Sequence, residues 1–346
     1  MHTRSVAFAL LLPAFLLLAP SGSAAQVSTT GGLEEPIELV TPTGSIHGTL
    51  LLPAEGGVQP VVLIIAGSGP TDRDGNNPLL PGQNNSLKLL AEGLAEQGIA
   101  SVRYDKRGVA ASTGAATDES DLRFDTYVED AAGWIGKLES DPRFSSVSIV
   151  GHSEGSLIGM LAADRAGADS FVSIAGIARP ASEVLRDQLR PQLPPNLWAE
   201  SERILESLEA GRMADSVPAT LAMLYRESVQ PYLISWFAYN PAEVIASLDI
   251  PILIAQGSTD IQVGVAEAHQ LHAAKPDAEL VIIEGMNHVL KEVPADPASQ
   301  QASYSDPLLP VVPELIDSIA AFIHTAADRR PSDPPLSSLH PPLLIL

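Results

Sequence analysis

The chain has 346 residues, a formal net charge of −22 at pH 7 and no cysteine. Because a surface this acidic repels phosphate groups, the charge argues against nucleic acid and anionic lipid headgroups as partners. The lack of cysteine excludes disulfides, a lipid-anchored cysteine and thiolate chemistry. Hydrophobic residues make up 45% of the chain, so a core of ordinary size must supply the stability.

The N-terminal segment 1–25 has the pattern of a secretory signal peptide. Arg4 lies near the start, an apolar run covers 6–19, and small residues lead to Ala25. The run is too short to cross a bilayer, and we expect cleavage near Ala25. A retained N-terminal anchor is the alternative. The protein is therefore expected to be exported, to the periplasm or the extracellular space, with no membrane span after signal removal.

Short apolar runs then alternate with helix-like patterns. Residues 36–52 alternate apolar and polar side chains around a Thr-Pro-Thr-Gly turn, which predicts a β-hairpin. The run 61–66 is apolar throughout, as in a strand that is buried on both faces, and a glycine-rich loop follows at 67–82. Further strands are predicted at 99–104, 147–150, 171–175, 251–255 and 280–283, and helices at 86–97, 124–139, 263–274 and 312–326.

This alternation predicts an α/β fold with a mostly parallel central sheet and helices on both faces. The core of the fold is expected to consist of residues 26–177 and 249–328. Residues 178–248 have helical patterns and no strand pattern, so they are expected to form a helical lid inserted into the sheet domain. The tail 329–346 is rich in Pro and Ser and is expected to be disordered.

A Gly-x-Ser-x-Gly pentad at 151–155 lies between the strand predicted at 147–150 and a helix-like stretch. In this setting the chain turns sharply and leaves the central serine, Ser153, exposed in a strained conformation. A serine hydroxyl becomes a good nucleophile only with a base, an acid that orients the base, and donors for the oxyanion. The pattern predicts a serine hydrolase if those partners are present.

His288 is the histidine expected to act as the base. It lies on the loop that follows the strand 280–283, where it can reach the serine. The other histidines lie in the signal segment, the tail, the hairpin or helices. His152 adjoins Ser153, and its side chain is expected to face away from the attack site.

Asp260 is expected to orient that base, because it follows the strand predicted at 251–255. The chain order Ser153, Asp260, His288 is the order that this turn motif requires. One oxyanion donor is expected to be the backbone N–H of Glu154, the residue after the nucleophile. The second is expected to be the N–H of Ser68 in the glycine-rich loop, with Gly69 as the alternative.

Five sequence blocks resemble those of the α/β-hydrolase superfamily. In particular, they resemble the bacterial carboxylesterases that are grouped with serine aminopeptidase-like and dienelactone hydrolase-like proteins. The resemblance implies an α/β-hydrolase fold and a serine catalytic triad, and it is much less specific for the substrate. One departure is Ala66-Gly67, where many esterases have His-Gly. The blocks are 67–76, 103–108, 151–155, 256–263 and 285–288.

The expected function is that of a secreted, cofactor-independent serine carboxylesterase, which hydrolyses short-chain acyl or aryl esters through an acyl-enzyme. The alternatives are a serine peptidase of the aminopeptidase or acylaminoacyl-peptidase type, and a non-catalytic binding protein on the same fold. A peptidase would need a carboxylate for the substrate ammonium. The helix 198–210 offers four glutamates, Glu200, Glu202, Glu206 and Glu209, which are more typical of a solvated face.

Aromatic residues are concentrated in the predicted lid. Each could belong to a small core of the lid itself, but as a set they are expected to line an apolar substrate pocket. No metal site is expected. The cluster Asp72-Arg73-Asp74 lacks the spacing of a calcium loop, and we expect it to form ion pairs with Asp105-Lys106-Arg107. The six aromatic residues are Trp198, Tyr225, Tyr232, Trp236, Phe237 and Tyr239.

Overall fold

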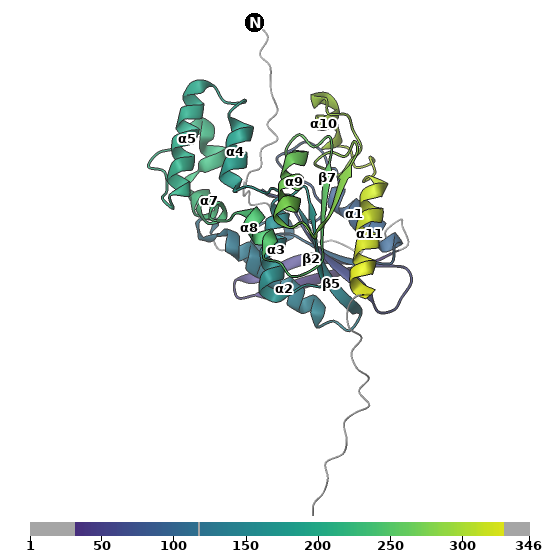
Figure 1. The fold of residues 1–346 in the computed structure, drawn as a ribbon. Coiled ribbons are helices and arrows are strands. Elements are labelled where there is room, and N and C mark those ends of the chain that lie inside the picture. The colour runs from purple at the N-terminus through teal and green to yellow at the C-terminus, as the bar shows by residue number, and fades with distance from the viewer. Residues whose placement is uncertain (1–31, 117, 329–346) are drawn as a thin grey trace, which may run out of the picture.

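The computed structural model describes residues 32–116 and 118–328, which Figure 1 shows as a coloured ribbon. The predicted signal peptide, 1–25, and the predicted disordered tail, 329–346, lie outside the described residues. The strands are β1 (Leu33–Thr41), β2 (Gly44–Leu52), β3 (Gln59–Ile65), β4 (Ala100–Tyr104), β5 (Phe144–His152), β6 (Ser170–Ile174), β7 (Ile252–Gly257) and β8 (Glu279–Ile283). The α-helices are α1 (Ser86–Glu96), α2 (Phe124–Glu139), α3 (Glu154–Ala166), α4 (Ala181–Leu189), α5 (Pro195–Glu209), α6 (Ala222–Tyr225), α7 (Gln230–Phe237), α8 (Pro241–Ala246), α9 (Val265–Ala274), α10 (Pro297–Ser303) and α11 (Pro313–Asp328).

The strands form a single sheet of eight, in the order β1-β2-β4-β3-β5-β6-β7-β8. The hairpin partners β1 and β2 are antiparallel, and β2 is antiparallel to β4. All the other neighbours are parallel. The predicted mostly parallel sheet and the predicted hairpin at 36–52 are therefore confirmed.

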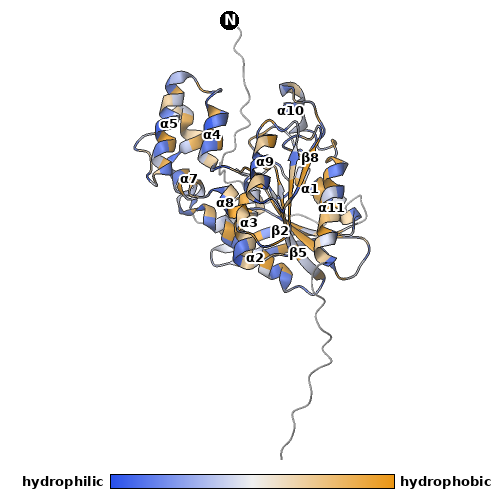
Figure 2. Cartoon of the chain, in the orientation of Figure 1, coloured by the Kyte–Doolittle hydropathy of each residue, from blue (hydrophilic) through white to orange (hydrophobic). Residues whose placement is uncertain are grey.

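The two faces of the sheet have separate hydrophobic cores, because side chains alternate along each strand. On β3, Val61, Leu63 and Ile65 pack with α2 and α3 on one face. Val62 and Ile64 pack with α1 and α11 on the other face. Figure 2 shows the hydrophobic residues concentrated on the strands and on the helix faces that meet them. This double burial explains the uninterrupted apolar run in the sequence.

Residues 178–248 lie between β6 and β7 and contain five α-helices, α4 to α8, two short 3-10 helices and no strand. In Figure 1, α4, α5 and α7 lie together beside the sheet domain. The segment packs back onto α2: the Trp236 ring stacks on Phe124 with centroids 5.9 Å apart, and the Phe124 N–H donates to the Ser235 hydroxyl at 2.8 Å. Its function as a lid stays a prediction.

The described part of the chain, 32–116 and 118–328, has no helix that is both long enough and apolar enough to span a membrane. The longest described α-helices, α2 and α11, have 16 residues each and cover the sheet with one apolar face. They are therefore amphipathic helices of an ordinary layered domain.

The loops after β7 and β8 touch through backbone atoms at Gly257. A Cβ built on Gly257 would lie 2.0 Å from the carbonyl oxygen of Met286. Because that oxygen belongs to the backbone, it cannot move aside as a flexible side chain could. A glycine at this position lets the two loops approach each other.

Gly257→Ala is therefore expected to destabilise the fold by on the order of 1–3 kcal/mol, the usual cost of forcing extra atoms into a packed site. The matched control is Gly136→Ala, because Gly136 is an exposed residue in α2 whose added Cβ would meet nothing within 4 Å. The control should gain about 0.5–1 kcal/mol from the higher helix propensity of alanine. Urea unfolding of both variants measures the two effects, and equal shifts in the same direction would contradict this account.

Candidate active site

Ser153 occupies a strained turn between β5 and α3. Its backbone has φ 56° and ψ −120°, a region that residues with a side chain rarely adopt. The Ser153 N–H donates to the Ile174 carbonyl at 2.8 Å and thereby holds the turn in place. Both flanking positions need glycine, because a side chain there would collide with the backbone. A Cβ on Gly151 would lie 2.3 Å from the Gly155 carbonyl oxygen, and a Cβ on Gly155 would lie 2.3 Å from the Ile65 carbonyl oxygen.

His288 and Asp260 form a buried pair beside this turn. The His288 Nδ1 lies 2.8 Å from the Asp260 Oδ2. The second carboxylate oxygen, Oδ1, accepts from the backbone N–H groups of Gln262 and Val263 at 2.8 and 2.9 Å. Burial acts to raise the pKa of Asp260, but the adjacent His288 and these hydrogen bonds outweigh it and lower the pKa below its ordinary value. Asp260 is therefore a carboxylate that fixes the orientation of the imidazole.

Side-chain hydrogen bonds tie the loops that carry this pair to each other and to α10. The Ser258 hydroxyl accepts from the Gly285 N–H at 2.9 Å, and the Thr259 hydroxyl donates to the Gly285 carbonyl at 2.8 Å. The Asn287 amide donates to the Ser303 hydroxyl at 2.8 Å and connects the second loop to α10. These contacts hold Asp260 and His288 in position relative to each other.

His152 lies inside the site, so the prediction that its side chain faces away is wrong. Its ring centroid is 4.9 Å from that of His288, and its Nε2 donates to the His288 carbonyl at 2.8 Å. Burial, and then the neighbouring His288, lower the pKa of His152 to about 3, so the ring is neutral. His152 therefore supports the loop that carries His288.

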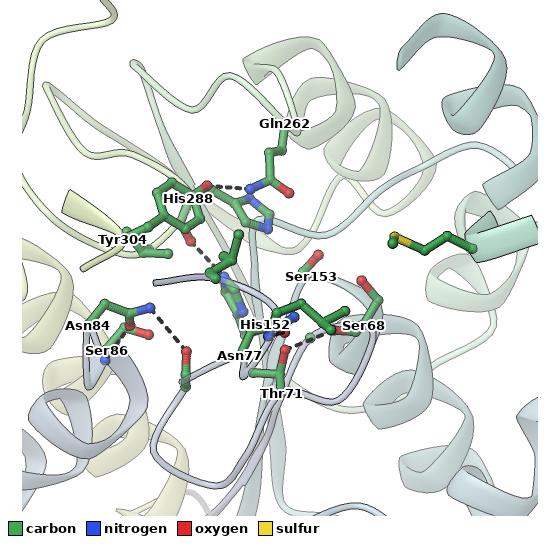
Figure 3. Close-up of a pocket in the computed structure, with 16 residues that line it drawn as sticks. Ser68, Thr71, Asn77, Asn84, Ser86, His152, Ser153, Gln262, His288 and Tyr304 are labelled. Atoms are coloured by element: carbon green, nitrogen blue, oxygen red, sulfur yellow. Dashed lines mark hydrogen bonds between the residues drawn. The ribbon is translucent and has the colours of Figure 1, made fainter. Parts of the chain in front are cut away.

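Ser153 and His288 face the same cavity, which Figure 3 shows in close-up. Its volume is about 330 Å³. Among the described residues, no hydrogen bond joins the Ser153 hydroxyl to His288, and such contacts often tighten only when substrate binds. Other lining residues come from the loop between β3 and α1, from α6, from the loops after β7 and β8, and from the end of α10: Ser68, Thr71, Asn77, Leu79, Leu80, Met223, Gln262, Val289 and Tyr304.

Two backbone N–H groups beside Ser153 have no acceptor within the described residues. Glu154 is the first residue of α3, where a helix leaves its N–H without an internal partner. Ser68 is buried and lines the cavity, whereas Gly69 does not. A Cβ on Gly67 would lie 3.2 Å from the Ser153 Cβ, so this loop approaches the nucleophile closely. The geometry suits Ser68 better than Gly69 as the second donor.

A buried ion pair that no sequence pattern predicted joins Lys106 to Glu154. The Lys106 Nζ lies 2.7 Å from the Glu154 Oε2, and the two side chains are 1% and 2% exposed. The predicted pairing of Lys106 with the 72–74 cluster is therefore wrong, because Lys106 pairs with Glu154 of the pentad. A charged residue inside the pentad, next to the nucleophile, is the only signal in the sequence that could have suggested this.

The cluster 72–74 does brace the loop between β3 and α1, as predicted, but with partners that are partly different. Arg73 pairs with Asp105 at 2.6 Å. Asp74 pairs with Arg103 of β4 at 2.5 Å. Arg107, by contrast, pairs with Asp130 of α2. In the described ranges, no group of three His, Cys, Asp or Glu residues could hold a metal ion.

The six aromatic residues predicted to line the pocket are absent from the lining of the cavity at Ser153, and this prediction is corrected. Four of them, Tyr225, Tyr232, Trp236 and Phe237, are buried in the core cluster that contains α2 and α3. The physical reason is that Phe124 of α2 offers an apolar surface on which Tyr232, Trp236 and Tyr239 pack. The aromatic residues therefore attach the segment 178–248 to the sheet domain.

Asp72 carries a pKa shift that can be tested. Burial, and then the charges of Asp74 and Asp105, raise the pKa of Asp72 from 3.8 to about 6, against the hydrogen bonds from the Asn76 and Asp74 backbone. Because the pKa is raised on folding, the folded state binds the extra proton between these two values. The stability that this group contributes is present below the unfolded pKa and is lost as the pH rises through about 6.

Asp72→Asn should remove this dependence, because the amide oxygen can still accept the N–H groups of Asp74 and Asn76. The free energy of unfolding of the variant, relative to the unmodified protein, should increase by up to about 3 kcal/mol between pH 4 and pH 7. Urea unfolding at several pH values measures the difference. A difference that is constant across this range would contradict the shift.

The chain is similar in sequence to known proteins. The family model described as serine aminopeptidase, S33, matches residues 83–218, which include the pentad but not Asp260 or His288. Esterase EstD of Thermotoga maritima is 28% identical over 249 residues. The matched region covers 71% of this chain and 58% of the length of that relative.

Solved structures of esterases have the same fold. Est1E from Butyrivibrio proteoclasticus superposes with a TM-score of 0.56 at 17% identity, over 85% of this chain and 99% of that one. The Pyrococcus furiosus esterase PF2001 superposes with a TM-score of 0.56 at 14% identity, over 93% of this chain and all of that one (100%). The chain therefore has the fold of these esterases, and in sequence it is similar to an esterase and to the serine aminopeptidase family model.

Proposed function

We propose that this protein is a serine carboxylesterase that hydrolyses short-chain acyl or aryl esters. The Ser153 hydroxyl attacks the acyl carbon while His288 takes its proton. The N–H groups of Glu154 and Ser68 stabilise the oxyanion, and His288 returns the proton to the leaving alcohol. Water then attacks the acyl-enzyme, with His288 again as the base, and releases the acid.

The observation that carries this proposal is the placement of Ser153 and the His288–Asp260 pair around one cavity. With Nδ1–H donating to Asp260 at 2.8 Å, the His288 Nε2 is left without a proton and can accept that of the serine. The strained turn exposes Ser153 to the same space. A non-catalytic binding protein would have no use for this arrangement, so the second alternative is disfavoured.

The character of the cavity favours an ester over a peptide with a free amino terminus. Among the described residues, the lining includes no Asp, Glu, Lys or Arg. Binding an ammonium group in such a cavity would leave the charge unpaired, which is costly. Leu79, Leu80, Met223 and Val289 offer apolar surface instead. At about 330 Å³, the cavity is near the lower end of the usual range for ligand sites, which supports a short acyl or aryl group.

The glutamates of α5 lend little support to the aminopeptidase alternative. Glu202 and Glu209 both pair with Arg186 of α4, and Glu200 pairs with Arg203 of its own helix. None of the α5 glutamates lines the described cavity. Their ion pairs support a structural role between α4 and α5.

Export of the protein is also part of this proposal. It is supported by the signal-peptide pattern of 1–25. Mass spectrometry of the protein purified from the cell envelope or the medium should find an N-terminus near Gln26. An intact N-terminus on cytoplasmic protein would contradict export.

Ser153→Ala should abolish turnover of a short-chain nitrophenyl ester, because it removes the nucleophilic hydroxyl. The fold should stay intact, because alanine keeps the Cβ and has the same backbone strain as serine at this φ and ψ. Asp260→Asn should lower kcat by roughly 10³–10⁴-fold, since the histidine would then be held in the wrong tautomer. Steady-state kinetics and circular dichroism measure both effects. Turnover retained by Ser153→Ala would refute the assignment of the nucleophile.

Nitrophenyl esters of increasing chain length, with one aminoacyl anilide, test the substrate class. The value of kcat/KM should be highest for short acyl chains and at least about 100-fold lower for the anilide, because the uncharged cavity leaves its ammonium unpaired. A preference for the anilide would favour the peptidase alternative.

A further inference from the structure

The buried Lys106 contacts both halves of the proposed oxyanion site. Its Nζ donates to the Gly67 carbonyl at 2.6 Å and to the Glu154 Oε2 at 2.7 Å. It is also 5.2 Å from the centroid of the Tyr127 ring, a distance typical of a cation–π contact. Gly67 follows β3, Lys106 follows β4 and Glu154 follows β5, so one ammonium group joins three strand ends.

The contact with Gly67 acts directly on one oxyanion donor. The Gly67 carbonyl and the Ser68 N–H belong to the same planar peptide unit. This peptide bond is trans, so the carbonyl and the N–H point in opposite directions. An ammonium at 2.6 Å from the oxygen therefore sets the direction of the N–H, and it also draws electron density from the N–H and makes it a stronger donor.

The contact with Glu154 acts on the other donor. Lys106 holds the side chain of Glu154, whose backbone N–H is the first of α3 and the proposed oxyanion donor. The second carboxylate oxygen, Oε1, accepts from the Tyr232 hydroxyl at 2.5 Å. Tyr232 lies in α7, within the helical segment 178–248. Burial, and then the charge of Glu154, raise the pKa of Tyr232 well above its ordinary value, so the hydroxyl remains a donor.

We propose that Lys106, Glu154 and Tyr232 form a buried positioning network that aligns the Ser68 and Glu154 N–H groups and couples them to the helical segment 178–248. The proposal rests on the proposed function, because it concerns the oxyanion site of the same reaction. Lys106 and Tyr232 touch no reacting atom in this scheme. They are positioning residues, and their effect is on the transition state rather than on substrate binding.

Tyr232→Phe is the most conservative test, because it removes one hydroxyl and keeps the ring that packs on α2. We expect kcat to fall by about 3- to 10-fold with KM changed by less than about 2-fold, a fraction of the effect of losing a whole oxyanion donor. The matched control is Tyr239→Phe. Tyr239 belongs to the same segment, and its hydroxyl also donates to a carboxylate at 2.7 Å, but that carboxylate belongs to Asp125 of α2 and not to Glu154. The control should keep the kcat of the unmodified protein.

Lys106→Met should have a larger effect in the same direction, a fall in kcat of about 10- to 100-fold with KM nearly constant. Affinity for a short alkyl boronic acid, which forms a tetrahedral adduct with the serine, should weaken by a similar factor, because the adduct places an oxygen in the oxyanion site. Each kcat is calculated per folded molecule, with the folded fraction measured by circular dichroism. If Lys106→Met does not fold, Tyr232→Phe against Tyr239→Phe decides the question.

A merely structural role would lower the thermal midpoint and leave kcat per folded molecule and boronate affinity unchanged, and that result would overturn the proposal. Equal kcat values for Tyr232→Phe and Tyr239→Phe would do so as well. Failure of the proposed function is a separate outcome: the unmodified protein would then not hydrolyse the esters at all, or Ser153→Ala would remain active.

Discussion

The site depends on a close backbone contact between the turn at Ser153 and the end of β3. Gly155 lies so near the Ile65 carbonyl that any side chain would collide with it. This contact brings the start of α3 against the loop at Gly67, so a nucleophile and two free N–H groups meet in one place. The strained backbone of Ser153 is tolerated because the surrounding strands over-determine it. The sheet and its two cores provide that rigidity.

Burial of charge gives the site its second level of organisation. Asp260 is held by His288 and by backbone donors, and Lys106 is held by Glu154, the Gly67 carbonyl and the Tyr127 ring. Removing one partner of such a buried pair leaves an uncompensated charge and is strongly destabilising. The cavity itself has an uncharged lining among the described residues, although the chain as a whole is highly acidic. The acidic residues therefore affect solubility and long-range repulsion and leave the local chemistry of the cavity to neutral groups.

Much of the fold was predictable from the sequence, because strands buried on both faces leave uninterrupted apolar runs such as 61–66. The positions of Asp260 and His288 were predictable because each follows such a strand, and the carboxyl ends of parallel strands share one edge of the sheet. The orientation of His152, the Lys106–Glu154 pair and the packing of Tyr232 and Trp236 on α2 were not. Each of these depends on which distant segments meet, and a local pattern of charges or aromatic residues is equally compatible with a surface or a pocket.

The most direct test of the account is to identify the residue that a fluorophosphonate modifies. The reagent phosphonylates an activated serine, and peptide mass spectrometry locates the adduct. We expect one adduct per chain, on Ser153, together with complete loss of ester hydrolysis. Modification of another residue, or full hydrolytic activity with Ser153 modified, would contradict it.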